Sequence, residues 1–420
     1  MPRSLETIRL SLTAAALAIA PISVAQAQEP SGFDAVMQAL QDLGDYVEAE
    51  TEPGSVDRAQ GYRFVLRRLE MHNDAFLPEN DVWHPVIDRC PTKLCKYGFD
   101  NPDAIYNMVK PLDPKLTYRL KGNRGTVPYI TFQQFSMGGG RFNTGGQLES
   151  KDLVLDEKGN FEIWLGPDNP DHHPNFIRMA PGNSSQLLIR QMMGDWLTDT
   201  EASLSIEAVD PAPGTPRSAP VLSAAEFDAR AKALAQFIAM TGPLYRKIIL
   251  AEPVNRFDEA YEKIDDGGFP TNFKNTMQYE VGADEAVLIE IPAVEAAWHN
   301  IQLGTLWGES PDYATRLISY NIIQAWKDKD GVLRYVIAQT DPGTPNWLDA
   351  AGNPRGGVFI RWQTPVGEVQ KPKVTRVKLT RLRSLLPKDH PVVTPAERAE
   401  QLRKRFLGYN RRMNPIDPPK

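Results

Sequence analysis

The sequence lacks the short motifs that mark many catalytic and cofactor-binding sites. It contains no G-x-S-x-G elbow, no H-E-x-x-H, no Walker loop and no G-x-G-x-x-G that opens a helix. Its only adjacent histidines, His172 and His173, lie near Asp168 and Asp171, which leaves a metal site open as an alternative. A solvated loop is favoured, because adjacent loop residues rarely chelate one ion without distant ligands. We therefore predict neither a metal nor a cofactor.

Cysteine is also scarce, with only Cys90 and Cys95 in 420 residues. No further metal ligands accompany the pair at regular spacing, which disfavours a metal site there. In an oxidising compartment so close a pair favours a disulfide. Closing this short loop would contribute on the order of 2 kcal/mol in the chain-entropy model.

Long apolar runs are absent except near the N-terminus, where residues 10–24 follow Arg3 and Arg9. The run contains Pro21, is too short for a stable bilayer span, and precedes a small-residue motif that ends at Ala27. This pattern predicts a signal peptide cleaved near Ala27 and a periplasmic or secreted protein. No later stretch approaches the roughly 20 apolar residues of a spanning helix, so we expect no transmembrane segment.

The net charge of -6 is unevenly distributed along the chain. Residues 371–412 hold thirteen Lys or Arg and three Asp or Glu, whereas residues 28–370 carry about -17. The basic region could lie on anionic lipid or bind an acidic ligand. The favoured interpretation is that it folds back onto the acidic body.

The length after the signal peptide suggests about two compact units. Proline, at 35 residues, disfavours long helices and suits short strands joined by shaped loops. We expect a signal peptide at 1–27, an N-terminal helical segment at 28–96, a first β unit at 97–210, a proline-rich linker and helices at 211–275, a second β unit at 276–386, and a basic C-terminal helix and tail at 387–420.

Hydrophobic periodicity predicts an α+β fold of mainly antiparallel sheet. FDAVMQALQDLGDYV and VDRAQGYRFVLRRLEMH have helical spacing, and capping boxes begin helices at Ser223 and Thr394, the latter ending at Gly408. TYRLKG, VPYITFQQF, NFEIWLG, SQLLIRQMM and EAVLIEIP are predicted strands, and ISYNIIQAW and VLRYVIAQT flank a hairpin tip at Asp330–Gly331. These strands predict two β-sandwich or jelly-roll-like units.

The stretch WHNIQLGTLWGESPDY is the first candidate binding surface. In a strand, Trp298, Asn300 and Gln302 share one face, and His299, Ile301 and Leu303 share the other, which is typical of core. The first face offers an aromatic ring and two amides to a sugar or another polar-edged ring compound. It is equally consistent with a tryptophan packed under a helix and amides that satisfy backbone groups.

Three loops add further candidates. The loop at 340–356 contains Asp341, Asn346 and Trp347, and long ordered loops are often functional, although Asp341 could simply cap its own turn. Asp100 and Asp103 could form an acid–base pair, but a structural role as Asx-turn residues is favoured. The glycine-rich stretch at 137–147 is equally consistent with a lid and with a plain flexible loop.

The segments DNPDAIY, TYRLKGNRGTVPYITF, WHNIQLGTLWGESPDY and TDPGTPNWLDAAGNPRGGVFIRW resemble the bacterial family catalogued as domain of unknown function twelve-fourteen. The resemblance covers roughly Arg58 to Leu385. It implies a β-sandwich, jelly-roll-like structure with added helices, and no established activity. Residues that match family motifs are Asp100, Asn101, Tyr106, Arg119, Trp298, Asn300, Gln302, Trp307, Asn321, Asp341, Asn346, Trp347 and Arg361.

Two classes of function remain. In a binding protein, a small-molecule ligand would lie in a cleft framed by Trp298, Trp307 and Trp347, with its polar edge fixed by Asn300, Gln302, Asn321, Asn346 and Tyr106. In a metal-independent hydrolase, lyase or isomerase, Glu309 or Asp341 would act as general base and Arg361 would stabilise negative charge. Binding is favoured because no catalytic constellation is recognised, and nucleic acid is not an expected partner.

Overall fold

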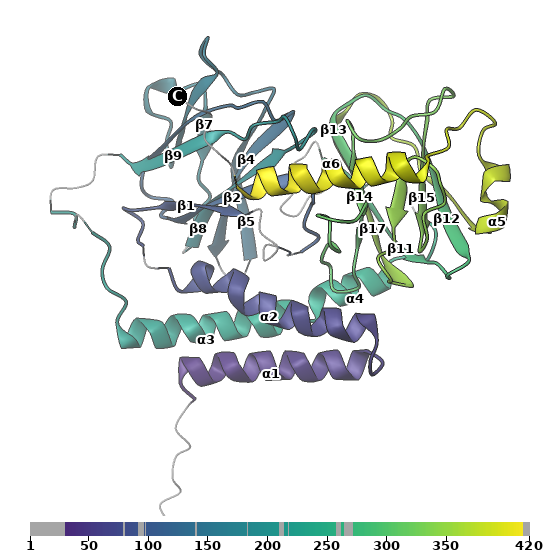
Figure 1. Ribbon diagram of the computed structural model, residues 1–420. Helices are drawn as coiled ribbons and strands as arrows, with labels where there is room; N and C mark the ends of the chain where they lie inside the picture. The colour runs from purple at the N-terminus through teal and green to yellow at the C-terminus, as the bar shows by residue number, and fades with distance from the viewer. Residues whose placement is uncertain are drawn as a thin grey trace, which may run out of the picture.

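The computed structural model describes residues 30–78, 80–90, 96, 98–138, 141–182, 184–209, 214–216, 218–257, 262–263 and 272–414. Two β units lie side by side, four helices lie beneath them, and a long C-terminal helix crosses both (Figure 1). The predicted α+β class, with two mainly antiparallel β units and helical segments at the N-terminus, centre and C-terminus, is confirmed. The predicted signal peptide lies outside the described residues.

The first β unit contains an inner sheet of order β1-β2-β8-β4-β5 and an outer sheet of order β7-β6-β3-β9. Its strands are β1 (Val86–Cys90), β2 (Ala104–Leu112), β3 (Tyr118–Asn123), β4 (Tyr129–Gly138), β5 (Arg141–Glu149), β6 (Asn160–Gly166), β7 (Phe176–Arg178), β8 (Ser184–Met192) and β9 (Ser203–Ala208), with a short 3-10 helix, η1, at Pro170–His172. Period-two alternation packs Ile130 and Phe132 of the inner sheet with Leu120 and Ile163 of the outer sheet. The strands predicted in this unit are therefore confirmed.

The second β unit repeats this two-sheet arrangement. Its inner sheet has the order β10-β11-β17-β13-β14 and its outer sheet the order β16-β15-β12-β18. The strands are β10 (Glu262–Lys263), β11 (Asn272–Glu280), β12 (Glu285–Pro292), β13 (Ala296–Gly304), β14 (Ser319–Asn321), β15 (Val332–Ala338), β16 (Trp347–Asp349), β17 (Arg355–Pro365) and β18 (Lys373–Lys378). The strand pairs are antiparallel in both units except β6–β7 and β15–β16.

One predicted strand is wrong over most of its length. The alternation in ISYNIIQAW predicted a strand to Trp326, but β14 ends at Asn321. The Asn321 side chain accepts hydrogen bonds from the backbone N–H groups of Ile323 and Gln324, which turns the chain. Period-two alternation does not reveal this local competition between an asparagine side chain and the strand ladder.

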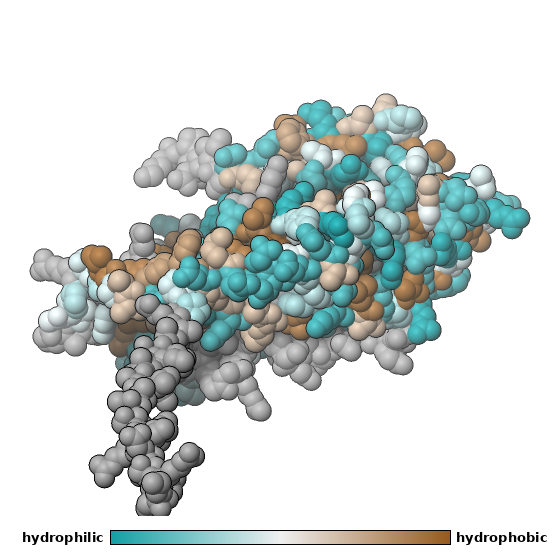
Figure 2. Space-filling model, turned by 90° about the horizontal axis from the view of Figure 1, so that it is seen from below, coloured by the Kyte–Doolittle hydropathy of each residue, from teal (hydrophilic) through white to brown (hydrophobic). Residues whose placement is uncertain are grey.

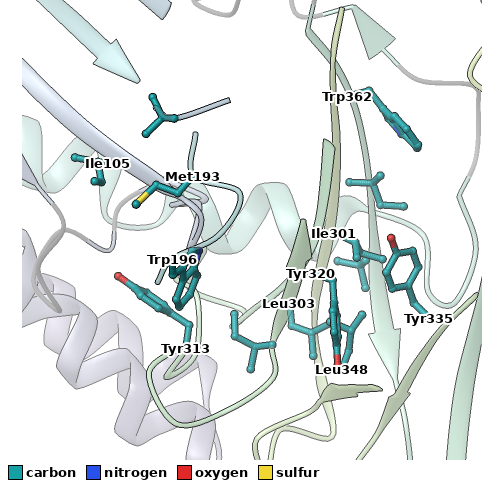
Figure 3. Packing of buried hydrophobic residues seen from close by; sticks show 14 of the residues in the cluster. Ile105, Met193, Trp196, Ile301, Leu303, Tyr313, Tyr320, Tyr335, Leu348 and Trp362 are labelled. Atoms are coloured by element: carbon teal, nitrogen blue, oxygen red, sulfur yellow. The ribbon is translucent and has the colours of Figure 1, made fainter. Parts of the chain in front are cut away.

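A single hydrophobic cluster connects the two β units. Figure 3 follows it from Met193 in the first unit, through Trp196 and Tyr313, to Tyr320 and Tyr335 in the second. Because core side chains from both units belong to one cluster, a substitution at their junction is expected to alter the packing of both units.

Four helices form a layer beneath the β units: α1 (Gly32–Glu50), α2 (Val56–Phe76), α3 (Ala224–Thr241) and α4 (Leu244–Ala251). The predicted capping box of Ser223 and Glu226 is present at the start of α3. Seen from below, this part of the molecule shows apolar patches among polar residues (Figure 2). A groove of about 530 Å³ lies between α1, α2 and α3, where Phe33 and Met37 are exposed.

The C-terminal region contains α5 (Leu379–Leu382), a 3-10 turn, η2 (Arg383–Leu385), and the long helix α6 (Pro395–Met413). The predicted end of this helix at Gly408 is wrong. A Cβ at position 408 would lie 2.7 Å from Cβ of Trp196, so this glycine permits close packing and does not end the helix. The favoured folding of the basic region onto the body is confirmed, because Arg398, Arg405 and Arg412 of α6 are buried.

Cys90 lies at the end of β1 and is disulfide-bonded, whereas its predicted partner Cys95 lies outside the described residues. None of the helices described in the chain has the length and apolar character needed to span a bilayer.

His299 gives the second β unit a predictable response to acid. It lies on the core face of β13, as predicted, with its ring centroid 4.4 Å from that of Trp362, and burial lowers its pKa to about 4. An unfolded histidine has a pKa of about 6.5, so its contribution to stability is complete above that pH and is lost as pH falls towards 4. Between pH 7 and pH 5, the free energy of unfolding should therefore fall by about 2 kcal/mol less in His299→Phe than in wild type. Denaturant unfolding at both pH values measures this difference. If the two proteins lose the same free energy of unfolding between pH 7 and pH 5, the expectation is contradicted.

Candidate functional site

The three tryptophans that were expected to frame one cleft lie in three different clusters. Trp298 packs with Ala104, Tyr129 and Met192, whereas Trp307 belongs to the helical layer and Trp347 to the large core. Trp298 and Trp307 are 0% exposed, and the indole N–H of Trp307 donates to the Asp57 carbonyl of α2. The expected tryptophan-lined cleft is therefore wrong.

The residues of the expected catalytic set are also separated. Asp341 forms an ion pair with Arg398 of α6, at 2.9 Å, and accepts a hydrogen bond from the Gly343 backbone. Glu309 is paired with Arg67 of α2; burial raises the pKa of Glu309, while that arginine opposes the rise. Each of the two alternative bases is therefore held in an ion pair by an arginine from a different helix.

Asn346 and the 98–103 turn have structural roles. The Asn346 amide donates to the carbonyls of Trp326 and Arg334, which holds two loops together. In the turn, the Asx-type bond is made by Asn101, whose side-chain oxygen accepts from the Asp103 N–H at 2.9 Å. Asp100 and Asp103 were expected to form such bonds themselves, but their carboxylates reach into the second β unit instead.

Asp103 is the centre of a buried polar network between the units. Its carboxylate accepts hydrogen bonds from Trp196 Nε1 at 3.0 Å, Asn321 Nδ2 at 2.9 Å and Asn300 Nδ2 at 3.3 Å. Burial raises the pKa of this carboxyl, and Arg405 and Arg412 oppose the rise. The Asp103 carboxylate itself is satisfied by protein groups alone, which is typical of a structural joint.

The two inner sheets face each other with polar side chains. In the first inner sheet, strand register places Tyr106, Arg190 and Thr131 side by side across β2, β8 and β4. In the second, Gln363 lies beside Trp298, and Arg361 beside Asn300. We call these seven residues the inter-sheet seam. Several contacts join its sides: Trp298 lies in one buried cluster with Tyr129, the Asn300 amide donates to Asn101, and Arg361 donates to the Phe99 carbonyl.

Several buried polar atoms on these facing surfaces have no hydrogen-bond partner in the described structure. They are Thr131 Oγ1 and Gln147 Oε1 in the first inner sheet, and Asn272 Oδ1, Trp298 Nε1, Asn300 Oδ1 and Gln363 Oε1 in the second. Buried polar groups are normally paired, because each unpaired group costs about 1–3 kcal/mol. The facing surfaces therefore contain polar atoms that could form hydrogen bonds but do not form them with each other.

Tyr106, Arg190 and Arg361 remain half-buried, so solvent reaches one edge of the seam. Burial raises the pKa of Tyr106, and the two arginines oppose the rise, which places all three groups within electrostatic reach of one another. Burial also lowers the pKa of each arginine. This edge combines two cationic groups and a phenol, a set that can bind a polar or anionic molecule.

The structure thus brings together Tyr106, Trp298, Asn300, Gln302, Asn321 and Arg361 of the predicted set, and it places Trp307, Glu309, Asp341, Asn346 and Trp347 elsewhere. Sequence reasoning missed Thr131, Arg190 and Gln363. The alternation in VPYITFQQF and SQLLIRQMM already placed Thr131 and Arg190 on the polar sides of their strands. That signal was available, but it did not show which surface those sides meet.

A larger groove, of about 800 Å³, lies on the outer sheet of the first unit and contains none of the predicted ligand-binding residues. Lys121, Glu162 and His173 line it. His173 lies 3.6 Å from Glu162 and packs near Trp164. Within the described ranges, no group of three or more metal-type ligands occurs.

Comparison with known proteins supports the fold but assigns no function. No family model matches the chain, and no curated protein matches it. The crystal structure of a putative uncharacterized protein from Burkholderia cenocepacia is 28% identical, with a TM-score of 0.74, and the match covers 84% of this chain and 98% of that one. A protein from Vibrio parahaemolyticus is 12% identical, with a TM-score of 0.43, over 83% of this chain and all of that one. The architecture is therefore similar to that of an uncharacterised bacterial protein.

Proposed function

We propose that this protein binds a small polar ligand at the inter-sheet seam and works outside the cytoplasm. The observation that carries the proposal is the set of unpartnered buried polar atoms on the facing surfaces of the two inner sheets. Polar surfaces that meet without forming hydrogen bonds to each other lower the stability of the folded state. Such local conflicts concentrate at functional sites. The signal peptide expected at residues 1–27 supports the compartment.

The chemistry of the seam indicates the kind of ligand. The side-chain oxygens of Thr131, Asn300 and Gln363 can accept hydrogen bonds, so hydroxyl or amine groups on a ligand would suit them. The Trp298 N–H can donate one. Its ring lies in the same buried cluster as Tyr129, so the site also contains aromatic side chains. A small compound with a polar-edged or hydroxylated ring meets these requirements.

The half-buried edge at Tyr106, Arg190 and Arg361 provides the entrance. The deeper atoms are closed to solvent, so a ligand reaches them when the inner sheets separate. We also propose, from the sequence motifs given above, that the chain belongs to the family catalogued as domain of unknown function twelve-fourteen, which implies a β-sandwich with added helices and no established activity. The alternative of a hydrolase, lyase or isomerase has weaker support, because each candidate base is already paired with an arginine, Glu309 with Arg67 and Asp341 with Arg398.

Thr131→Val tests the proposal because it removes one unpartnered hydroxyl with almost no change in volume. Without ligand, the variant should be as stable as wild type or more stable by about 1 kcal/mol, since a buried unsatisfied group is lost. Compounds selected by thermal shift of residues 28–420 from a panel of sugars, hydroxy acids and aromatic acids should bind the variant about tenfold more weakly. Isothermal titration measures the affinity.

The matched control is Thr126→Val, because the Thr126 hydroxyl pairs with Thr200 at an exposed site of the same β unit. This control should bind the selected compounds like wild type. Equal affinity of wild type and Thr131→Val for every selected compound would place the binding site outside the seam.

A further inference from the structure

We propose that the ligand of the inter-sheet seam carries a carboxylate, and that the Arg361 guanidinium binds it. This inference rests on the proposed function, since it names the chemical class of ligand for the same site.

Among the described residues, Arg361 donates hydrogen bonds only to neutral oxygens. One NH group donates to Gln302 Oε1 at 2.7 Å and the other to the Phe99 carbonyl at 2.6 Å. A guanidinium has five N–H donors, so these two bonds leave capacity for further acceptors. The side chain is half-buried, and no ion pair joins it to a carboxylate among the described residues.

The carboxylates near Arg361 are already used by other groups. Asp100 accepts from the Ser310 backbone N–H at 2.8 Å and from the Ser310 hydroxyl at 2.6 Å. Asp103 is bound by Trp196, Asn300 and Asn321. Neither carboxylate is therefore free to move to Arg361 without breaking the joint between the two β units.

Four other buried arginines of this chain have a direct carboxylate partner. Their ion pairs are Arg67–Glu309, Arg246–Asp57, Arg334–Asp328 and Arg398–Asp341. Removal of a cation from water is costly unless an anion compensates it. Arg361 differs from these four arginines because its guanidinium has neutral partners only among the described residues. Arg405 and Arg412 also bind neutral oxygens, but they are buried against the Trp196 ring, whereas Arg361 is half-buried at the edge of the seam.

The opposite inner sheet adds two groups that suit the same anion. Arg190 is close enough for Arg361 to contribute to the lowering of its pKa, so an anion bound between the two guanidinium groups would relieve their repulsion. The Tyr106 hydroxyl accepts a hydrogen bond from the Asn101 N–H at 3.2 Å, which leaves its own proton available for donation.

A carboxylate fits this arrangement better than a larger oxyanion. Its two oxygens match two parallel N–H groups on one edge of a guanidinium, and the resulting charge-assisted bonds are stronger than neutral ones. The remaining amide and hydroxyl oxygens of the seam require donors, which hydroxyl groups on the rest of the ligand would supply. A phosphate would bring additional negative oxygens towards these same acceptors.

The test compares each of three acids with a neutral partner of similar shape. The pairs are acetate and acetamide, benzoate and benzamide, and gluconate and glucitol, each titrated at millimolar concentrations against residues 28–420 by thermal shift and calorimetry. In wild type at least one acid should bind about tenfold or more tightly than its neutral partner. Arg361→Gln should remove that preference.

Arg403→Gln is the matched control, because Arg403 is exposed on α6 and binds only Glu400. It should keep the wild-type preference. Arg361→Lys provides a second variant with the charge but without the planar fork, and it should show an intermediate preference. This variant keeps the test informative if Arg361→Gln does not fold.

The possible results separate the two proposals. If neutral partners bind as tightly as acids and Thr131→Val weakens both, the carboxylate assignment fails and the proposed binding function stands. If acids are preferred and both Arg361 variants retain the full preference, Arg361 is not the group that binds the carboxylate. If none of the compounds binds, or if binding is insensitive to Thr131→Val and to the Arg361 variants, both proposals fail.

Discussion

Asp103→Ala is expected to lower the free energy of unfolding by about 3–5 kcal/mol, the cost of removing one partner from a buried charged network. The Asp103 carboxylate is fully buried and accepts hydrogen bonds from Trp196, Asn300 and Asn321. Alanine leaves the Trp196 indole N–H without its acceptor. It also leaves the positive charges of the buried Arg405 and Arg412 without the negative charge that compensates them.

Guanidinium-induced unfolding of the two proteins at pH 7 measures this loss. Asp152→Ala is the control, because Asp152 is an exposed carboxylate of the same β unit, paired with Lys151 at the surface. Surface substitutions of this kind usually change stability by less than about 0.5 kcal/mol. A loss below about 1 kcal/mol in Asp103→Ala would show that water replaces the carboxylate without penalty.

Arg405→Met is expected to cost about 3 kcal/mol, because Arg405 joins α6 to both β units. Its guanidinium donates to the Tyr313 carbonyl at 2.7 Å and to the Ser319 hydroxyl at 2.9 Å in the second unit. It also lies over the Trp196 ring of the first unit, 4.5 Å from the ring centroid. Methionine fills part of the space but satisfies neither oxygen, and it leaves the Asp103 charge with less compensation.

The same helix provides the control for this prediction. Arg403→Met changes an exposed arginine two residues away, bound only to Glu400 on its own helix, and it should cost less than about 0.5 kcal/mol. A double-mutant cycle between Asp103 and Arg405 should give a coupling of at least about 1 kcal/mol, since both belong to one network. Additive losses would mean that the two residues stabilise the joint independently.

Local patterns in the sequence were sufficient for most elements of the fold. The capping boxes at Ser223 and Thr394 begin helices α3 and α6, because a cap is formed by residues only three positions apart. Alternating residues in TYRLKG and EAVLIEIP form β3 and β12, because each strand must separate a core face from another face. The strand expected up to Trp326 failed because Asn321 turns the chain with its own side chain.

Long-range partners explain the incorrect parts of the site prediction. Trp307 was assigned to a ligand cleft, yet its indole binds a carbonyl 250 positions earlier, in α2. Asp341 was a candidate base, yet it pairs with Arg398 on a helix that crosses both units. No local pattern records either partner, because each contact depends on how distant elements pack.

Local sequence patterns specify which residues share a strand face and at which caps helices begin, and the charge distribution predicts that the basic C-terminal region packs on the acidic body. Alternation placed Trp298, Asn300 and Gln302 on one side of a strand, which the structure confirms. That this side meets the polar side of another sheet, which carries Thr131 and Arg190, follows from the three-dimensional packing alone. The reason is that alternation describes one strand at a time, whereas the partner of a face is set by how whole sheets and helices pack together.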